Sequence, residues 1–119
     1  MSRVTITKGW FNETLTDERK LELGVTKIAI AYLDCDIYES AVEALNFISP
    51  LLQSGSVLIF DDWFRNKGNP EQGVQGATLD WLKRNPNISL QHFHNSDTRT
   101  ATFIVRVGET HLSPQINCV

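Results

Sequence analysis

The sequence predicts a single α/β domain of 119 residues, and three observations support that prediction. Two short apolar runs, Ile28–Asp34 and Val57–Phe60, have the composition of strands covered on both faces of a parallel sheet. A helical pattern follows each run, as expected for parallel strands joined by right-handed crossovers. Two alternating segments, Ile88–His94 and Ala101–Val107, predict an antiparallel hairpin. We therefore expect a mostly parallel sheet that closes with this hairpin and has helices on both faces.

The N-terminal residues predict a strand and then a helix. The segment Val4–Thr7 is rich in β-branched residues and ends at Lys8-Gly9, which favours a short strand. Thr16 followed by two acids is typical of a helix start, because its hydroxyl can accept from a free backbone N–H. Gly24 is the expected end of that helix.

The two central helices are predicted from their caps and their apolar spacing. Asp36 and Glu39 have the spacing of a capping box, so we expect Asp36 to cap the helix that ends near Pro50. The segment Asn69–Glu71 predicts the entry of the next helix, and Asn85-Pro86 its end. The buried stripe of that helix is expected at Val74, Ala77, Trp81 and Leu82. No regular structure is expected after Gly108.

The composition excludes several classes of protein. There are 11 basic residues against 14 acidic ones, a net charge of −3, which argues against a nucleic-acid-binding protein held by phosphate contacts. No apolar run approaches the length of a membrane span, and no apolar segment of a signal peptide follows Met1. Two cysteines do not make a disulfide framework, so we expect a cytoplasmic protein.

Acidic residues follow both central apolar runs. Asp34 follows the first run, and Asp61 and Asp62 follow the second. If these strands are neighbours, the three carboxylates meet at the carboxyl edge of the sheet, where open α/β folds bind their ligands. Carboxylate oxygens suit Mg²⁺, Mn²⁺ or Ca²⁺. The alternative, that the acids only cap turns and helices, stays open on the residues alone.

The string from Leu33 to Ser40, an amphipathic helix, Pro50, Gly55 and a strand that ends in Asp61-Asp62 resemble the macrocin O-methyltransferase family. The earlier Lys8–Phe11 segment also resembles that family. The resemblance covers nearly the whole chain, 4–107, but only the C-terminal half of a family domain, strands 3 to 7. It implies a partial Rossmann-like class I methyltransferase sheet. It also implies O-methyl transfer from S-adenosylmethionine to a sugar or natural-product hydroxyl, with the help of a divalent metal.

The resemblance also implies roles for individual residues. Asp34, Asp61 and Asp62 match the metal-binding acids of the family, and we expect Asp34 to be the catalytic residue. A metal there would hold the acceptor hydroxyl and lower its pKa. Gly9, Trp10 and Phe11 match a turn near the adenine of the cofactor, although ordinary core packing would also explain the two aromatic residues. The loop from Trp63 to Gly73 is expected to cover the acceptor.

The chain departs from the family in its cofactor motifs. Class I methyltransferases hold the cofactor with a glycine-rich turn, and no G-x-G occurs in this sequence. The chain begins near the family's third strand, so strand Ile28–Asp34 lacks the neighbour that it has in the family order 3-2-1-4-5-7-6. We expect a homo-oligomer through this strand, a separate chain that supplies the missing half, or movement of Val4–Thr7 into the vacant place.

Three functions therefore remain open. The chain is a methyltransferase that acts only when completed, a non-catalytic oligomeric binding module that keeps the half-fold, or another metal-dependent enzyme built on the same acids. An isolated monomer is not expected to be active. Cofactor binding separates the first function from the second, and metal binding without cofactor binding favours the third.

Overall fold

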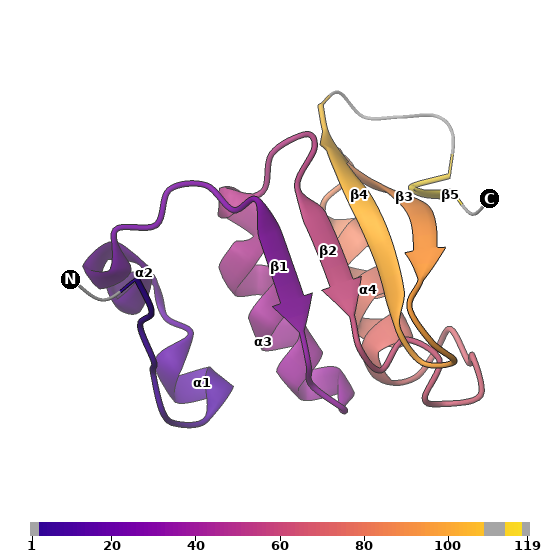
Figure 1. The fold of residues 1–119 in the computed structure, drawn as a ribbon, viewed down its shortest axis with the longest axis horizontal. Helices are drawn as coiled ribbons and strands as arrows, with labels where there is room; N and C mark the ends of the chain where they lie inside the picture. The colour runs from indigo at the N-terminus through magenta and orange to yellow at the C-terminus, as the bar shows by residue number, and fades with distance from the viewer. Residues whose placement is uncertain (1–2, 109–113, 118–119) are drawn as a thin grey trace.

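The computed structural model describes residues 3–108 and 114–117 and confirms the α/β class (Figure 1). Its helices and strands are, in chain order, α1 (Phe11–Thr14), α2 (Asp17–Leu23), β1 (Ile30–Leu33), α3 (Tyr38–Ile48), the 3-10 turn Ser49–Leu51, β2 (Val57–Phe60), α4 (Gly73–Arg84), β3 (Ile88–Asn95), β4 (Ala101–Val107) and β5 (Ile116–Asn117). None of the helices in these described residues is long and apolar enough to cross a membrane.

The five strands form one open sheet in the order β1-β2-β4-β3-β5. β1 pairs parallel to β2, and β3 pairs parallel to β5, whereas β4 runs antiparallel to both of its neighbours. The predicted hairpin is confirmed, and the prediction of a mostly parallel sheet is confirmed in part. The expectation of no regular structure after Gly108 is wrong at β5, which adds to the open edge of β3.

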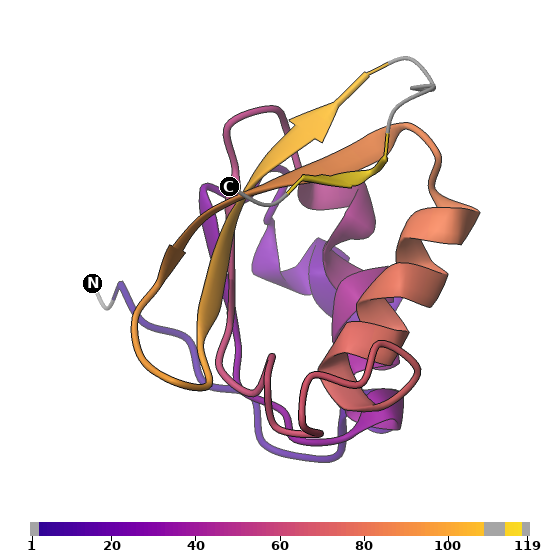
Figure 2. The same cartoon turned by 90° about the vertical axis from the view of Figure 1, so that its right-hand side faces the viewer.

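The long helices α3 and α4 lie on the same face of the sheet (Figure 2). Each follows a strand and leads further across the sheet in the same direction, and right-handed crossovers then place both on one side. The predicted helices on both faces are therefore not found among the described residues. The core lies between the sheet and these helices, with Leu45, Leu58, Phe60, Trp81 and Phe103 almost fully buried. The predicted stripe of α4 is confirmed.

Three local predictions from the sequence are corrected. Val4–Thr7 forms no strand, because the fold does not pair it with the five-stranded sheet of the described residues. Helix α4 begins at Gly73, after the predicted entry, because the Asn69 side chain accepts from the Glu71 N–H (2.9 Å) in a turn. The strand in Ile28–Asp34 is shorter than predicted and is not covered on both faces, since Ile30 is 65% exposed.

Helix α2 begins and ends as predicted. The Thr16 hydroxyl accepts from the Arg19 N–H (3.1 Å), and Gly24 ends the helix in the left-handed conformation with φ 68°. None of its residues is buried, so local contacts contribute most of its stability.

We therefore expect Thr16→Ala to weaken α2 locally rather than to unfold the domain. Loss of the cap should cost about 1 kcal/mol, or about five-fold faster amide exchange within α2. Hydrogen exchange of the α2 amides measures this effect. Thr26→Ala, an exposed change in the following loop, is the control and should leave those amides unchanged. Equal exchange in both variants would contradict the cap.

Candidate functional site

The carboxyl ends of β1 and β2 bring the predicted acids together. The Asp61 N–H donates to the Leu33 carbonyl (3.0 Å), which continues the parallel ladder by one residue. Asp34 and Asp61 therefore leave adjacent strands at the same edge of the sheet, where Asp61 raises the pKa of the Asp34 carboxyl. The expected convergence at this edge is thus present in the structure.

Three carboxylates, which we call the acidic cluster, lie close enough together to hold a cation. Asp34, Asp36 and Asp62 each offer one oxygen, and these oxygens lie within 4.8 Å of one another. The predicted set differs at one member, because the Asp61 carboxylate accepts from the Thr100 hydroxyl (2.9 Å). Whether Asp61 also binds a metal stays a prediction.

Asp36 was expected to cap α3, and this interpretation is wrong. Ile37 is the N-cap residue of α3, and no side chain makes a capping hydrogen bond there. The Asp36 side chain instead pairs with the Arg65 guanidinium (3.2 Å), and one of its oxygens lies within 4.8 Å of an Asp62 oxygen. The D-x-D spacing of Asp34 and Asp36 is the sequence signal for this arrangement, since alternate residues of an extended segment point to the same side.

Asp62 is the most deeply placed acid of the cluster. Its residue is 4% exposed, and its Oδ2 has no hydrogen-bond partner among the described residues. Burial, then the hydrogen bond to Asp36 and the charges of Asp36 and Asp61, raise its pKa from 3.8 to about 6. A buried carboxylate oxygen without a donor is costly, and a bound cation would remove that cost.

The exposed Asp34 carboxyl is also affected by its neighbours. Its hydrogen bond with Asp61, its partial desolvation and the charges of Asp61 and Asp36 raise its pKa, against a smaller lowering by Arg99. Both groups therefore hold protons more tightly than ordinary aspartates, Asp62 chiefly because it is buried and Asp34 chiefly because of Asp61 beside it. A divalent cation would reverse both effects.

Two further residues position Asp61 and were not predicted. The Asp97 carboxylate accepts from the N–H groups of Arg99 (2.7 Å) and Thr100 (2.8 Å), and these bonds lower the pKa of Asp97. This turn presents the Thr100 hydroxyl to Asp61. Asp97 and Thr100 lie far along the chain from Asp61, so no local pattern could have revealed them.

A pocket of about 530 Å³ adjoins the acidic cluster. It brings the predicted cofactor residues Gly9, Trp10 and Phe11 together with Asp34 and Asp36. Trp10 is 77% exposed, so the alternative interpretation, that Trp10 is an ordinary core residue, is wrong. Phe11 is also exposed, at 37%. Cofactor binding by these residues stays a prediction, and the pocket supplies a place for it.

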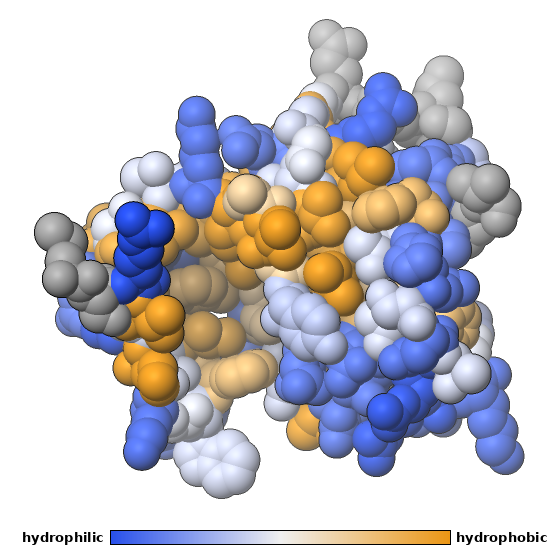
Figure 3. Space-filling model, in the orientation of Figure 1, coloured by the Kyte–Doolittle hydropathy of each residue, from blue (hydrophilic) through white to orange (hydrophobic). Residues whose placement is uncertain are grey.

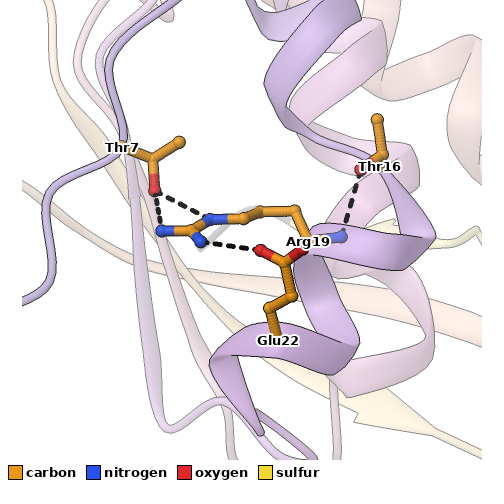
Figure 4. Close-up of polar contacts among 4 residues, drawn as sticks. All are labelled: Thr7, Thr16, Arg19 and Glu22. Carbon is orange, nitrogen blue, oxygen red and sulfur yellow. Dashed lines mark hydrogen bonds and ion pairs between the residues drawn. The ribbon is translucent and has the colours of Figure 1, made fainter.

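The segment that carries Gly9 and Trp10 is held in place by Arg19 of α2 (Figure 4). The Thr7 hydroxyl oxygen accepts from Nε (3.1 Å) and Nη2 (2.8 Å) of Arg19. The remaining Nη1 of Arg19 pairs with Glu22 (2.9 Å), which orients the guanidinium. Gly9 itself has φ 136°, and a Cβ there would lie 2.7 Å from the Thr14 methyl, so the turn requires glycine.

Cys35, which lies between two of the acids, is not a nucleophile here. Burial, then the charges of Asp62, Asp34 and Asp36, raise the pKa of its thiol to about 11. The thiol is therefore protonated at neutral pH, and only the thiolate is nucleophilic.

The comparisons with known proteins point to one family. Residues 1–81 match the family described as macrocin-O-methyltransferase (TylF). No curated protein matches the chain significantly. Among solved structures, the O-methyltransferase NovP is similar, with a TM-score of 0.61 and 22% identity over 83% of this chain and 36% of that chain. At this identity, the likeness to NovP concerns the fold.

CalS11, described as a calicheamicin methyltransferase, is similar with a TM-score of 0.60 and 29% identity over 82% of this chain. Its apo structure, described as a TDP-rhamnose 3'-O-methyltransferase, is similar with a TM-score of 0.58 and 25% identity. This chain covers 35% and 39% of those two chains. It therefore spans little more than a third of the length of the solved structures that it matches.

Proposed function

We infer the function of this chain from one premise: the chain belongs to the macrocin-O-methyltransferase family. We propose that it forms the metal-binding and acceptor-binding corner of an S-adenosylmethionine-dependent O-methyltransferase. The substrate class that we propose is a sugar or natural-product hydroxyl. The observation that carries the proposal is the acidic cluster, which opens beside the pocket lined by Gly9, Trp10 and Phe11.

The pocket residues would hold the adenine end of the cofactor. The exposed indole of Trp10 and the ring of Phe11 offer flat apolar surfaces, and Gly9 allows the turn that presents them. When bound, S-adenosylmethionine supplies a methyl group on a positively charged sulfur. The carboxylates at the ends of β1 and β2 would place the acceptor hydroxyl in line with that methyl group.

The acidic cluster fits a hard divalent cation. Each member offers a carboxylate oxygen, and the Asp62 carboxylate also has a buried oxygen, Oδ2, with no hydrogen-bond partner among the described residues. When bound, Mg²⁺ or Mn²⁺ would lower the pKa of a hydroxyl placed against it. Arg65, which pairs with Asp36 at the rim, supplies part of the balancing positive charge when no cation is bound.

We expect one Mg²⁺ or Mn²⁺ to bind saturably per chain, and S-adenosylhomocysteine to bind more tightly when the cation is present. Calorimetric titration at a measured oligomeric state tests both. Asp62→Asn should abolish cation binding, because it removes a charge and a ligand oxygen. Asp17→Asn, the same change on exposed helix α2, is the matched control and should bind as the wild type does.

Two outcomes would contradict the proposed function. Equal cation binding by Asp62→Asn and wild type would contradict the role of the acidic cluster. Absence of S-adenosylhomocysteine binding by an assembled, folded chain would favour the alternative, a non-catalytic oligomeric binding module that keeps the methyltransferase half-fold.

A further inference from the structure

The loop between β2 and α4 surrounds another pocket, of about 550 Å³, which we call the loop pocket. Five polar side chains line it: Arg65, Asn66, Lys67, Asn69 and Gln72. Two of these side chains are positively charged and three are amides, and no carboxylate of the described residues lines the loop pocket. Figure 3 shows hydrophilic side chains gathered over the end of the molecule that carries this loop, at the lower right.

The positive charge of the loop pocket contrasts with the rest of the chain, which has 14 acidic residues against 11 basic ones. The pocket beside the acidic cluster is lined by Asp34 and Asp36, and a pocket on α3 is lined by Glu39 and Glu43. Glu71 belongs to the same loop but lines a different pocket, on α4. An anion is therefore attracted to the loop pocket and repelled by the acids elsewhere.

Several hydrogen-bond donors of the loop pocket have no partner among the described residues. The Asn69 Oδ1 accepts from the Glu71 N–H (2.9 Å), and the Asn69 amide nitrogen donates to none of the described groups. The Lys67 ammonium forms no ion pair with them either. Arg65 pairs with Asp36 through Nη1 (3.2 Å), which leaves its Nε and Nη2 available to donate. A phosphate group has three strong acceptor oxygens and can accept from several such donors at once.

Hydrogen bonds hold the loop in place around these donors. The Asn69 N–H donates to the Asn66 carbonyl (3.0 Å), and the Gln75 side chain of α4 donates to the Trp63 carbonyl (3.0 Å) at the start of the loop. Lys67 has φ 56°, in the left-handed region that residues other than glycine seldom adopt. A loop fixed in this way loses little conformational entropy when a ligand binds.

Arg65 connects the loop pocket with the acidic cluster. Its side chain lines the pocket, and its Nη1 lies 3.2 Å from the Asp36 Oδ2. Asp36 belongs to the acidic cluster together with Asp34 and Asp62. A single side chain therefore separates the two sites. An acceptor whose hydroxyl lies at the acidic cluster would extend its other end toward the loop pocket.

We propose that the loop pocket binds a phosphate group carried by the sugar acceptor, and that Arg65 and Lys67 are specificity-determining residues. The inference rests on the proposed function, because it names the class of acceptor: a phosphorylated sugar rather than a neutral one. Arg65 and Lys67 balance the charge of the phosphate, and the amide side chains donate to its remaining oxygens. A neutral sugar leaves these donors without a charged partner, so it binds more weakly.

NMR titration of the full chain at pH 7, with a chelator and without cofactor, tests the proposal. The probes are glucose 1-phosphate, glucuronate and glucose, which share a sugar ring and differ in the charged group. We expect saturable shifts of the Lys67, Gly68 and Asn69 amide signals with glucose 1-phosphate. Glucuronate should bind more weakly, because a carboxylate has fewer acceptor oxygens and less charge, and glucose should not bind.

Lys67→Gln should weaken the binding of glucose 1-phosphate about ten-fold, because it removes a charged donor. Lys67→Arg restores the charge and should restore most of the binding. Lys27→Gln is the matched control, since Lys27 is also exposed but precedes β1, at the opposite end of that strand from the acidic cluster. It should bind glucose 1-phosphate as the wild type does.

Three outcomes would overturn the proposal: no binding of glucose 1-phosphate by the folded chain, equal binding by Lys67→Gln and wild type, or binding of glucose or glucuronate as tight as that of glucose 1-phosphate. The last result with glucuronate would assign the loop pocket to a carboxylate instead. The titration contains neither cofactor nor cation, so its failure is distinguishable from failure of the cation binding that tests the proposed function.

Discussion

Replacing Asp62 with asparagine is expected to raise the free energy of unfolding at pH 7 by about 3 kcal/mol when divalent cations are removed. The pKa of Asp62 rises from 3.8 to about 6 in the folded chain, chiefly through burial and then through Asp36 and Asp61. Each pKa unit corresponds to about 1.4 kcal/mol. The neutral asparagine avoids this penalty and can donate to Asp36.

The charged form of Asp62 is the destabilising one. Between about pH 4 and pH 6 the folded chain holds a proton that the unfolded chain has lost, so stability falls as the pH rises through this window. Below the unfolded pKa of 3.8 both states are protonated, and wild type and Asp62→Asn should unfold alike. Asp34, whose pKa is also raised, acts in the same direction in both proteins.

Urea denaturation at pH 3.5 and pH 7 with a chelator measures the difference. The control Asp17→Asn should stay within about 0.5 kcal/mol of wild type at both pH values, because Asp17 is exposed. Added Mg²⁺ should stabilise wild type at pH 7 but not Asp62→Asn. If wild type and Asp62→Asn had equal stability at pH 7, the inference that burial of the charged Asp62 destabilises the fold would be wrong.

Trp81→Ala is expected to lower the free energy of unfolding by about 3–5 kcal/mol. Trp81 is fully buried on α4, and its indole N–H donates to the Ser49 hydroxyl oxygen (2.5 Å) at the end of α3. The change leaves a large cavity and removes this link between the two helices. A domain of this size is stable by about 5–15 kcal/mol, so much of the chain should unfold near room temperature.

Trp10→Ala is a control with the same change of side chain. Trp10 is 77% exposed, so its loss should alter stability by no more than about 0.5 kcal/mol. Circular dichroism during urea denaturation compares the two variants. A loss below about 1 kcal/mol for Trp81→Ala would show that the packing of α4 on α3 contributes little.

Local signals in the sequence predicted those elements whose partners lie nearby in the chain. The Thr16 cap, the Gly24 end of α2, the apolar stripe of α4 and the hairpin of β3 and β4 all follow from neighbouring residues, and the structure confirms them. Val4–Thr7 has the composition of a strand but joins no sheet of the described residues, because strand pairing depends on which segments the fold brings side by side. Composition cannot say whether that partner is present.

The same distinction holds for the candidate site. Acids at the ends of two apolar runs predicted a cluster at the sheet edge, because parallel neighbouring strands end at the same place. Which carboxylates face one another depended on contacts across the fold. The Asp61 carboxylate accepts from Thr100, and Asp36 pairs with Arg65 rather than capping the helix. Neither contact leaves a mark in the local sequence.

The sequence therefore predicted an α/β domain with acids at its carboxyl edge, and its resemblance to a known family indicated the methyltransferase kind. Periodicity, caps and strand-end positions are properties of short segments, and short segments carry them in any context. Only the tertiary structure showed that Asp36 belongs to the acidic cluster. It also showed that β1 is unpaired among the described residues, and that the sheet face opposite α3 and α4 is partly exposed. Pairing brings together residues far apart in the chain, and only the folded sheet shows which edge and which face it leaves uncovered.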